Sequence, residues 1–220
     1  HAPRIFTHLT RDRALAEAEA ARDRAKLGLR RHPLDGVPVS WKDLFDTAGV
    51  ETCAGSDLLK GRVPTRDARV LQTATLNGLV CLGKTHMSEL AFSGLGLNPI
   101  TQTPPCVNDL TAVSGGSSSG AAASVAFGLA PAAIGSDTGG SVRIPAAWND
   151  LVGLKTTLGR VPMQGVVPLC KSFDTETYIS AIIKRSYTNL YNSDLIGKLN
   201  SAPHLLPIKN GKKINFKTYS

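Results

Sequence analysis

The sequence predicts an α/β fold, and three features indicate it. Residues 66–84 read as a helix, a glycine turn at Gly78 and a short strand, which is the alternation typical of α/β proteins. Residues 121–128 are small and mostly apolar, as in a tightly packed helix, and a turn containing Pro131 then leads into a short buried segment. With 220 residues and 42% apolar content, the chain is long enough to bury a sizeable core.

The N-terminal part of the chain predicts a surface helix. Residues 8–31 combine alanine, leucine and many charged residues, with Thr10 or Asp12 available as the N-cap. We interpret the run of charges as a solvated helix face.

Residues 34–50 change character and contain a lysine among apolar residues. A β-branched run follows Gly36, and Lys42 lies close to Trp41 and Phe45. Burial lowers the pKa of a lysine toward values at which the neutral amine can act as a base. The alternative is a snorkelling or salt-bridged lysine with Asp43 or Asp46 as its partner, and this segment alone favours that alternative.

Two Gly/Ser clusters flank the predicted small-residue helix: GGSSSG at 115–120 and GSDTGGS at 135–141. Consecutive glycines allow backbone N–H groups to converge on one point, as in an anion or oxyanion pocket. A serine at the end of such a loop can act as a nucleophile. The clusters therefore predict a site that requires close backbone approach.

Composition excludes several other functions. The formal net charge of +8 is concentrated after residue 170 and aromatic content is 5%, low for base stacking, so we expect no nucleic-acid contact. The cysteines form no CxxC pair, so we expect free thiols, no metal and no cofactor. Neither an apolar leader nor an 18-residue apolar run is found, so we expect a cytoplasmic protein without membrane contact. The cysteines are Cys53, Cys81, Cys106 and Cys170.

His86 is a further candidate because a histidine could form a dyad with a serine. No acidic partner lies at a telling spacing, and a lone histidine near a helix start is more often structural. We therefore expect a structural role.

Three blocks in this order carry a family resemblance. They are GVPVSWKDLFD at 36–46, GGSSSG at 115–120 and GSDTGGSVRIPA at 135–146. Together they resemble the amidase signature family of Ser-cisSer-Lys hydrolases, whose pattern is G-[IV]-P-[IV]-x-x-K-D, GGSSGG and D-T-G-G-S-[IV]-R-x-P-A. The last block is the most specific of the three.

The resemblance implies a role for each matching residue. Ser141 matches the nucleophile, Ser117 the bridging serine whose preceding peptide is cis, and Lys42 the base. Asp137 and Arg143 flank the loop, and we expect them to form a bracing charge pair. The implied oxyanion hole consists of the backbone N–H groups of Thr138, Gly139, Gly140 and Ser141.

The resemblance also implies a fold and an activity. The fold is a mixed, twisted central β-sheet flanked by helices, and the activity is hydrolysis of a small-molecule carboxylic amide through an acyl-enzyme. Two alternatives stand beside it: an inactive truncated fragment or paralogue, and the A-type subunit of an amidotransferase that works with partner subunits. The oligomeric state is left open, with a homodimer as one alternative.

The chain departs from the family pattern at several places. Ser114 stands where proline is usual, and Ser119 replaces the first glycine of the closing pair. From about Glu176 we expect the resemblance to stop, because the composition shifts there toward tyrosine and asparagine. We therefore divide the chain into a catalytic core at 1–175, truncated relative to the family, and a divergent basic tail at 176–220. The break in composition suggests a different origin for the tail, such as a frameshift, a gene-model error or a fusion, with an ordinary divergent tail as the alternative. We expect its final part to be flexible or to form one hairpin around Asn210 and Gly211.

Overall fold

The computed structural model describes residues 2–157, 159–169, 179–184, 208–209 and 212–213. Contacts divide the chain into two units, 1–183 and 184–220. The expected boundary between residues 175 and 176 lies outside the described residues and stays a prediction.

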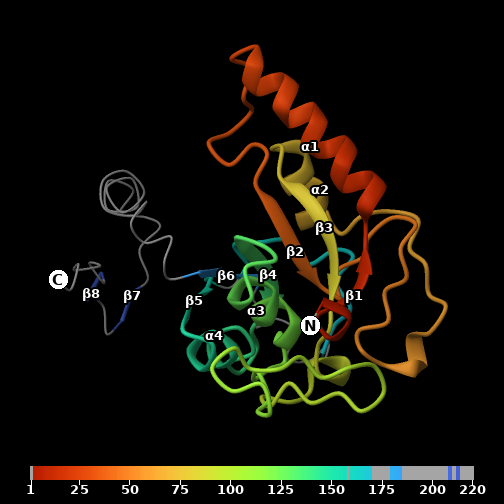
Figure 1. Ribbon diagram of the computed structural model, residues 1–220, viewed down its shortest axis with the longest axis vertical. Helices are drawn as coiled ribbons and strands as arrows, with labels where there is room; N and C mark the ends of the chain where they lie inside the picture. Colours follow the sequence, from red (N-terminus) through yellow and green to blue (C-terminus); the bar gives the residue numbers. More distant parts are fainter. Residues whose placement is uncertain (1, 158, 170–178, 185–207, 210–211, 214–220) are drawn as a thin grey trace. The chain divides into compact units, whose positions relative to one another are not determined.

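A mixed six-stranded sheet forms the centre of the first unit, in the order β1-β3-β2-β4-β6-β5 (Figure 1). β2 runs parallel to both β3 and β4, whereas β1 is antiparallel to β3 and β6 is antiparallel to β4. The predicted mixed α/β fold is confirmed. The strands are β1 (Phe6–Leu9), β2 (Pro38–Lys42), β3 (Val80–Thr85), β4 (Ala132–Ser136), β5 (Leu151–Lys155) and β6 (Ile179–Lys184).

Helices flank this sheet. α1 and α2 pack against β3, α3 packs against β4 and β2, and α4 packs against β5 (Figure 1). The helices are α1 (Arg11–Lys26), α2 (Arg69–Leu76), α3 (Ser119–Ala126) and α4 (Arg143–Trp148), with short 3-10 turns η1 (Ala2–Arg4), η2 (Asp57–Leu59) and η3 (Glu89–Ala91).

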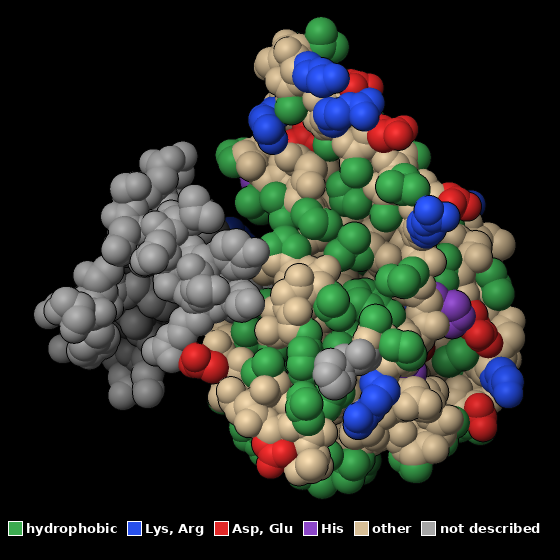
Figure 2. Space-filling view, viewed as in Figure 1, with side chains coloured by type: hydrophobic (Ala, Val, Ile, Leu, Met, Phe, Trp, Pro, Cys, Tyr) green, Lys and Arg blue, Asp and Glu red, His purple; other side chains and the backbone are tan. Residues whose placement is uncertain are grey.

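The expected helix over residues 8–31 is shorter in the structure, although one of the two expected N-cap residues, Thr10, does precede it. Residues 6–9 form β1, because their backbone pairs with β3, and α1 begins only at Arg11 and ends at Lys26. Thr10 is the N-cap residue, but its hydroxyl donates to the carbonyl of Cys81 at 2.8 Å instead of capping the helix. Side chains of both charges cover α1 (Figure 2), which agrees with a solvated face.

The elements expected at residues 66–84 and between the two Gly/Ser clusters are present. The predicted helix, turn and strand at 66–84 are α2, Gly78 with a φ of +91°, and β3. The predicted small-residue helix is α3, and the buried segment after Pro131 is β4. GGSSSG therefore runs from a loop into the start of α3, and GSDTGGS runs from the end of β4 into the loop before α4.

Two apolar clusters hold the first unit together. The larger surrounds Trp41 and Phe45, whose rings meet edge to face at 5.6 Å between centroids. The smaller consists of small side chains between α3, β4 and α4. At Gly120 a Cβ would lie 2.6 Å from the His86 nitrogen, so glycine permits α3 to approach the end of β3 this closely. The close approach fixes the GGSSSG loop against the carboxyl ends of the central strands.

The second unit contains two short strands, β7 (Ile208–Lys209) and β8 (Lys212–Lys213), which pair antiparallel. This pairing agrees with the hairpin alternative for the tail, although Asn210 and Gly211 themselves lie outside the described residues. Among the helices that the structure describes, none combines the length and apolar character that crossing a membrane requires.

Candidate active site

Lys42 is the last residue of β2, in the middle of the sheet. Its side chain is fully buried. The two carboxylates expected as alternative partners are used elsewhere: Asp43 pairs with Lys84 at 3.1 Å, and Asp46 accepts two hydrogen bonds from Arg62. The salt-bridged alternative for Lys42 with either aspartate is therefore wrong.

The side chain of Lys42 instead ends between two serine hydroxyls. Its Nζ lies 2.6 Å from Ser117 Oγ and 2.8 Å from Ser136 Oγ. Both serines are also buried. The structure thus brings together two of the three predicted catalytic residues, which are separated by 75 positions in the sequence.

Burial lowers the pKa of Lys42 from 10.5 to about 7, and the charge of Asp137 opposes this shift. Removal from water disfavours the ammonium form, and no carboxylate within the described residues pairs with it directly. A substantial fraction of the side chain is therefore neutral near pH 7 and able to accept a proton.

Ser117 lies in a loop that the backbone holds on both sides. The peptide bond between Gly116 and Ser117 is cis, as the resemblance implies. The Ser117 carbonyl accepts from the Ser88 amide at 3.1 Å, and the Gly116 amide donates to the Gly94 carbonyl at 2.8 Å. A Cβ at Gly116 would lie 2.5 Å from the Gly96 nitrogen, so this position requires glycine.

Ser141 lies at the end of the loop that connects β4 to α4. Its carbonyl accepts from the Ser118 amide at 3.1 Å, which ties the two Gly/Ser clusters together. Its side chain is partly exposed, and its hydroxyl makes no hydrogen bond to another described residue. This placement leaves the predicted nucleophile open to a ligand.

The loop before Ser141 has free backbone donors. No hydrogen bond to another described residue uses the N–H groups of residues 138–141, and Gly139 is exposed. Gly140 has a φ of +137°, and a Cβ there would lie 2.9 Å from the side chain of Ile144. Glycine at this position lets the loop turn without a clash.

Asp137 fixes this loop from its buried side. Its buried carboxylate accepts from the Arg143 guanidinium at 2.9 and 3.0 Å and from the amides of Val142 and Arg143 at 3.2 Å. Lys155 donates to the Thr138 carbonyl at 3.0 Å. Burial raises the pKa of the Asp137 carboxyl. The hydrogen bonds that it accepts from Arg143 and Val142 lower its pKa by more, so the net shift is downward. The expected bracing pair of Asp137 and Arg143 is confirmed.

His86 is buried and its Nδ1 lies 3.1 Å from the hydroxyl of Thr101. Burial lowers its pKa. Its carbonyl accepts from the Gly120 amide at 2.9 Å, so the residue anchors α3. These contacts agree with the structural role expected from the sequence.

The structure shows two polar contacts at the site that the sequence does not indicate. Ser136 belongs to the GSDTGGS block, but nothing in the spacing singled out its contact with Lys42, 94 positions away. The buried pair of Asp43 and Lys84 was also missed, because it forms only when β2 and β3 lie side by side.

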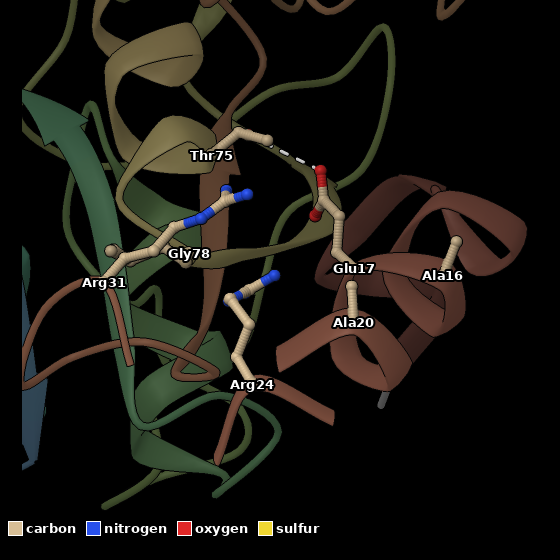
Figure 3. Close-up of a pocket in the computed structure, with 8 residues that line it drawn as sticks. Ala16, Glu17, Ala20, Arg24, Arg31, Thr75 and Gly78 are labelled. Carbon is tan, nitrogen blue, oxygen red and sulfur yellow. Dashed lines mark hydrogen bonds between the residues drawn. The ribbon is translucent and has the colours of Figure 1, made fainter. Parts of the chain in front are cut away.

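Two hollows lie near these elements. One of about 420 Å³ is lined by Ser88, Phe92, Leu97 and Pro99, directly beside the Ser117 loop through the Ser88 amide. The other, about 280 Å³, lies where α1 faces α2 and is lined by polar residues including Glu17 and Arg31 (Figure 3).

The polar side chains of the second hollow are engaged in the scaffold. Arg24 is held by Asp35 through two hydrogen bonds, and Glu17 accepts from Arg13 and Thr75. Within the described residues, no group of three or more histidine, cysteine, aspartate or glutamate side chains is placed to hold a metal ion. The three cysteines in that part of the chain are free thiols, and Cys170 lies outside it.

Comparison with known proteins supplies the family. The model of the Amidase family matches residues 4–206, most of the chain. The chain belongs to the amidase family. The family match extends past Glu176, whereas the individual relatives match over 169–171 residues, so the point at which the resemblance ends stays a prediction.

Individual relatives of this amidase-family chain are much longer. It is 48% identical over 171 residues to the A-type subunit of the glutamyl-tRNA(Gln) amidotransferase of Anaeromyxobacter dehalogenans, covering 77% of the chain and 34% of that protein. The chain thus spans about a third of the length of the curated relatives it matches.

Solved structures share the same core. The native peptide amidase of Stenotrophomonas maltophilia superposes with a TM-score of 0.74 at 33% identity, over 83% of this chain and 37% of that one. The allophanate hydrolase of Kluyveromyces lactis gives 0.72 at 35% identity, over 82% and 29%. Both solved structures are longer than this chain and share its fold at 33–35% identity.

Proposed function

We propose that this chain carries the catalytic core of an amidase, which cleaves a carboxylic amide through an acyl-enzyme on Ser141. The observation that carries the proposal is the 2.6 Å contact between the buried Lys42 amine and the Ser117 hydroxyl, beside a loop of free backbone donors. The substrate is a small-molecule amide, and no cofactor takes part.

Acylation begins with two linked proton transfers. The neutral Lys42 amine takes the proton of Ser117, and Ser117 takes the proton of Ser141 as the Ser141 oxygen attacks the amide carbonyl. The serine between base and nucleophile extends the reach of a buried lysine. The C–O bond to Ser141 forms while the carbonyl π electrons move onto oxygen.

The developing oxyanion is stabilised by the loop amides. The N–H groups of residues 138–141 are free of other described partners and precede or belong to the nucleophile. One such donor typically contributes about 3 kcal/mol to transition-state stabilisation. Because Asp137 fixes the loop from its buried side, the donors need little reorganisation when charge develops.

The relay then runs in reverse. The Lys42 ammonium returns its proton through Ser117 to the leaving amine as the C–N bond breaks. A water or a second amine attacks the acyl-enzyme by the same path and releases Ser141. Proton and electron counts balance without a metal or redox partner.

A second candidate is the A-type subunit of an amidotransferase. It is favoured by the 48% identity to the corresponding subunit of the glutamyl-tRNA(Gln) amidotransferase, against 33–35% for the amidase structures above. Under this alternative the same site releases ammonia from an amide donor for use by partner subunits. Copurification with such partners and ATP-dependent turnover of an amide donor would distinguish it from a stand-alone hydrolase.

A third candidate is an inactive fragment or paralogue of such an amidase. The test is covalent labelling of the purified chain by a fluorophosphonate, with the labelled residue located by mass spectrometry. We expect labelling at Ser141, lost in Ser141→Ala and strongly slowed in Lys42→Ala, but unchanged in Lys60→Ala, an exposed lysine. Soluble, monodisperse chain that never labels would favour the inactive alternative.

Three coarser expectations also stay proposals. They are a cytoplasmic location, a homodimer as one alternative for the oligomeric state, and a division of the chain between residues 175 and 176.

A further inference from the structure

Lys42 has a second close contact that the proposed relay does not use. Its Nζ lies 2.8 Å from Ser136 Oγ, only slightly farther than the 2.6 Å to Ser117 Oγ. The inference drawn from this contact rests on the proposed function, because it concerns the orientation of the proposed base.

The fold holds Ser136 firmly in this position. It is the last residue of β4, which runs parallel to β2, and its side chain is only 2% exposed. The Ser118 hydroxyl donates to the Ser136 carbonyl at 3.2 Å, and Asp137, the next residue, is anchored by Arg143. The hydroxyl of Ser136 is therefore a fixed partner for Lys42.

The protonation state of Lys42 determines what this contact does. A neutral amine has two N–H groups and one lone pair, whereas an ammonium has three N–H groups and none. The base must direct its lone pair toward the Ser117 hydroxyl to accept a proton from it. A second acceptor that takes one N–H limits the rotation of the amine and leaves the lone pair available for Ser117.

We propose that Ser136 is a positioning residue for this reaction: its hydroxyl accepts a hydrogen bond from Lys42 and aligns the amine with Ser117. It touches neither the substrate nor the reacting carbonyl. When Lys42 becomes an ammonium during acylation, the same hydroxyl holds one of its three N–H groups, so the amine keeps its place between the two proton transfers.

The charged groups around Lys42 determine whether a change in its pKa can be attributed to the Ser136 contact. Asp137 is the carboxylate whose charge acts on Lys42, and it is neutralised by Arg143 and approached by Lys155 at 3.6 Å. Asp43, the chain neighbour of Lys42, is paired with Lys84 from β3. Removing the Ser136 hydroxyl changes none of these charges.

The test compares three variants in fluorophosphonate labelling between pH 5 and 9. Ser136→Ala removes the acceptor, Ser136→Thr retains a hydroxyl, and Ser40→Ala is the matched control. Ser40 lies on β2, is buried like Ser136 and contacts another serine, Ser124, at 2.7 Å, but its hydroxyl makes no hydrogen bond to Lys42. Circular dichroism establishes which variants are folded.

We expect Ser136→Ala to slow labelling on the high-pH plateau about 10- to 100-fold, because the Lys42 ammonium that forms during acylation loses one hydrogen bond to a charged group. The midpoint of its pH profile should move to lower pH, because the ammonium form loses an acceptor. Ser136→Thr should retain most of the rate if its methyl group is accommodated, and Ser40→Ala should keep the wild-type midpoint. An unchanged plateau and midpoint in folded Ser136→Ala would overturn the proposal.

A second readout does not depend on activity. Titration of the Lys42 Nζ by nitrogen-15 NMR should show a lower midpoint in Ser136→Ala than in the wild type. If the wild type fails to label, the amidase proposal fails, while this titration still decides whether Ser136 acts on Lys42. Equal midpoints in the two proteins would refute the positioning role.

Discussion

The lowered pKa of Lys42 predicts how acylation depends on pH. The perturbation is pH itself, varied from 5 to 9 with the wild type and Lys42→Ala side by side. Only the neutral amine can accept a proton, so the rate should rise with pH and level off above the pKa of about 7.

The size of the pKa shift of Lys42 sets the size of the expected effect on the rate. A lysine with the ordinary pKa of 10.5 is neutral in about one molecule in 3000 at pH 7, whereas one with a pKa of about 7 is neutral in about half of the molecules. Burial of Lys42 therefore increases the reactive fraction roughly 1000-fold at neutral pH. Below pH 6 the rate should fall about tenfold for each unit of pH.

The assay is the second-order rate of fluorophosphonate labelling at Ser141, corrected for hydrolysis of the reagent at each pH. Lys42→Ala should label slowly at every pH and lose the midpoint near 7. A wild-type rate that continues to rise to pH 9 or beyond, with no plateau, would show that Lys42 keeps an ordinary pKa and would refute the reasoning.

Three further predictions concern stability. Because Lys42 binds fewer protons when folded than when unfolded between pH 7 and 10.5, the wild-type free energy of unfolding should rise across that window by about 5 kcal/mol relative to Lys42→Met, measured by urea unfolding. Asp43→Asn should cost about 3–5 kcal/mol, since it leaves the Lys84 ammonium buried without its carboxylate; an unchanged melting temperature would contradict this. Gly135→Ala should lower the melting temperature and slow labelling, because its Cβ would lie 2.5 Å from Ser118 Oγ; a crystal structure with Ser118 unmoved would count against it.

From the sequence, the two Gly/Ser loops are easier to locate than the edges of the fold. Ser117 and the loop ending at Ser141 stand in local motifs, and glycine spacing alone indicates converging backbone donors there. Residues 6–9 give a weaker signal, because a four-residue strand exists only through its pairing with β3. Beside the longer charged helix that follows, such a segment is absorbed into the helix pattern.

The polar contacts of Lys42 show the same limit. Asp43 is its neighbour in sequence but pairs with Lys84, because β3 places that lysine beside it. Ser136 contacts Lys42 only through the parallel pairing of β2 and β4. Such partners are determined by strand order and register, which local composition does not specify.

The separate pairing of Asp43 has a consequence for the timing of the proposed reaction. Lys84 is paired with Asp43, and Asp137 is paired with Arg143 and approached by Lys155, so no carboxylate charge near Lys42 among the described residues is left to balance a Lys42 ammonium. Each proton that reaches Lys42 creates a positive charge away from water, and the described carboxylate whose charge acts on it is Asp137, which is already paired with Arg143. That charge favours proton transfer from Lys42 through Ser117 to the leaving amine, and this transfer returns Lys42 to its neutral form.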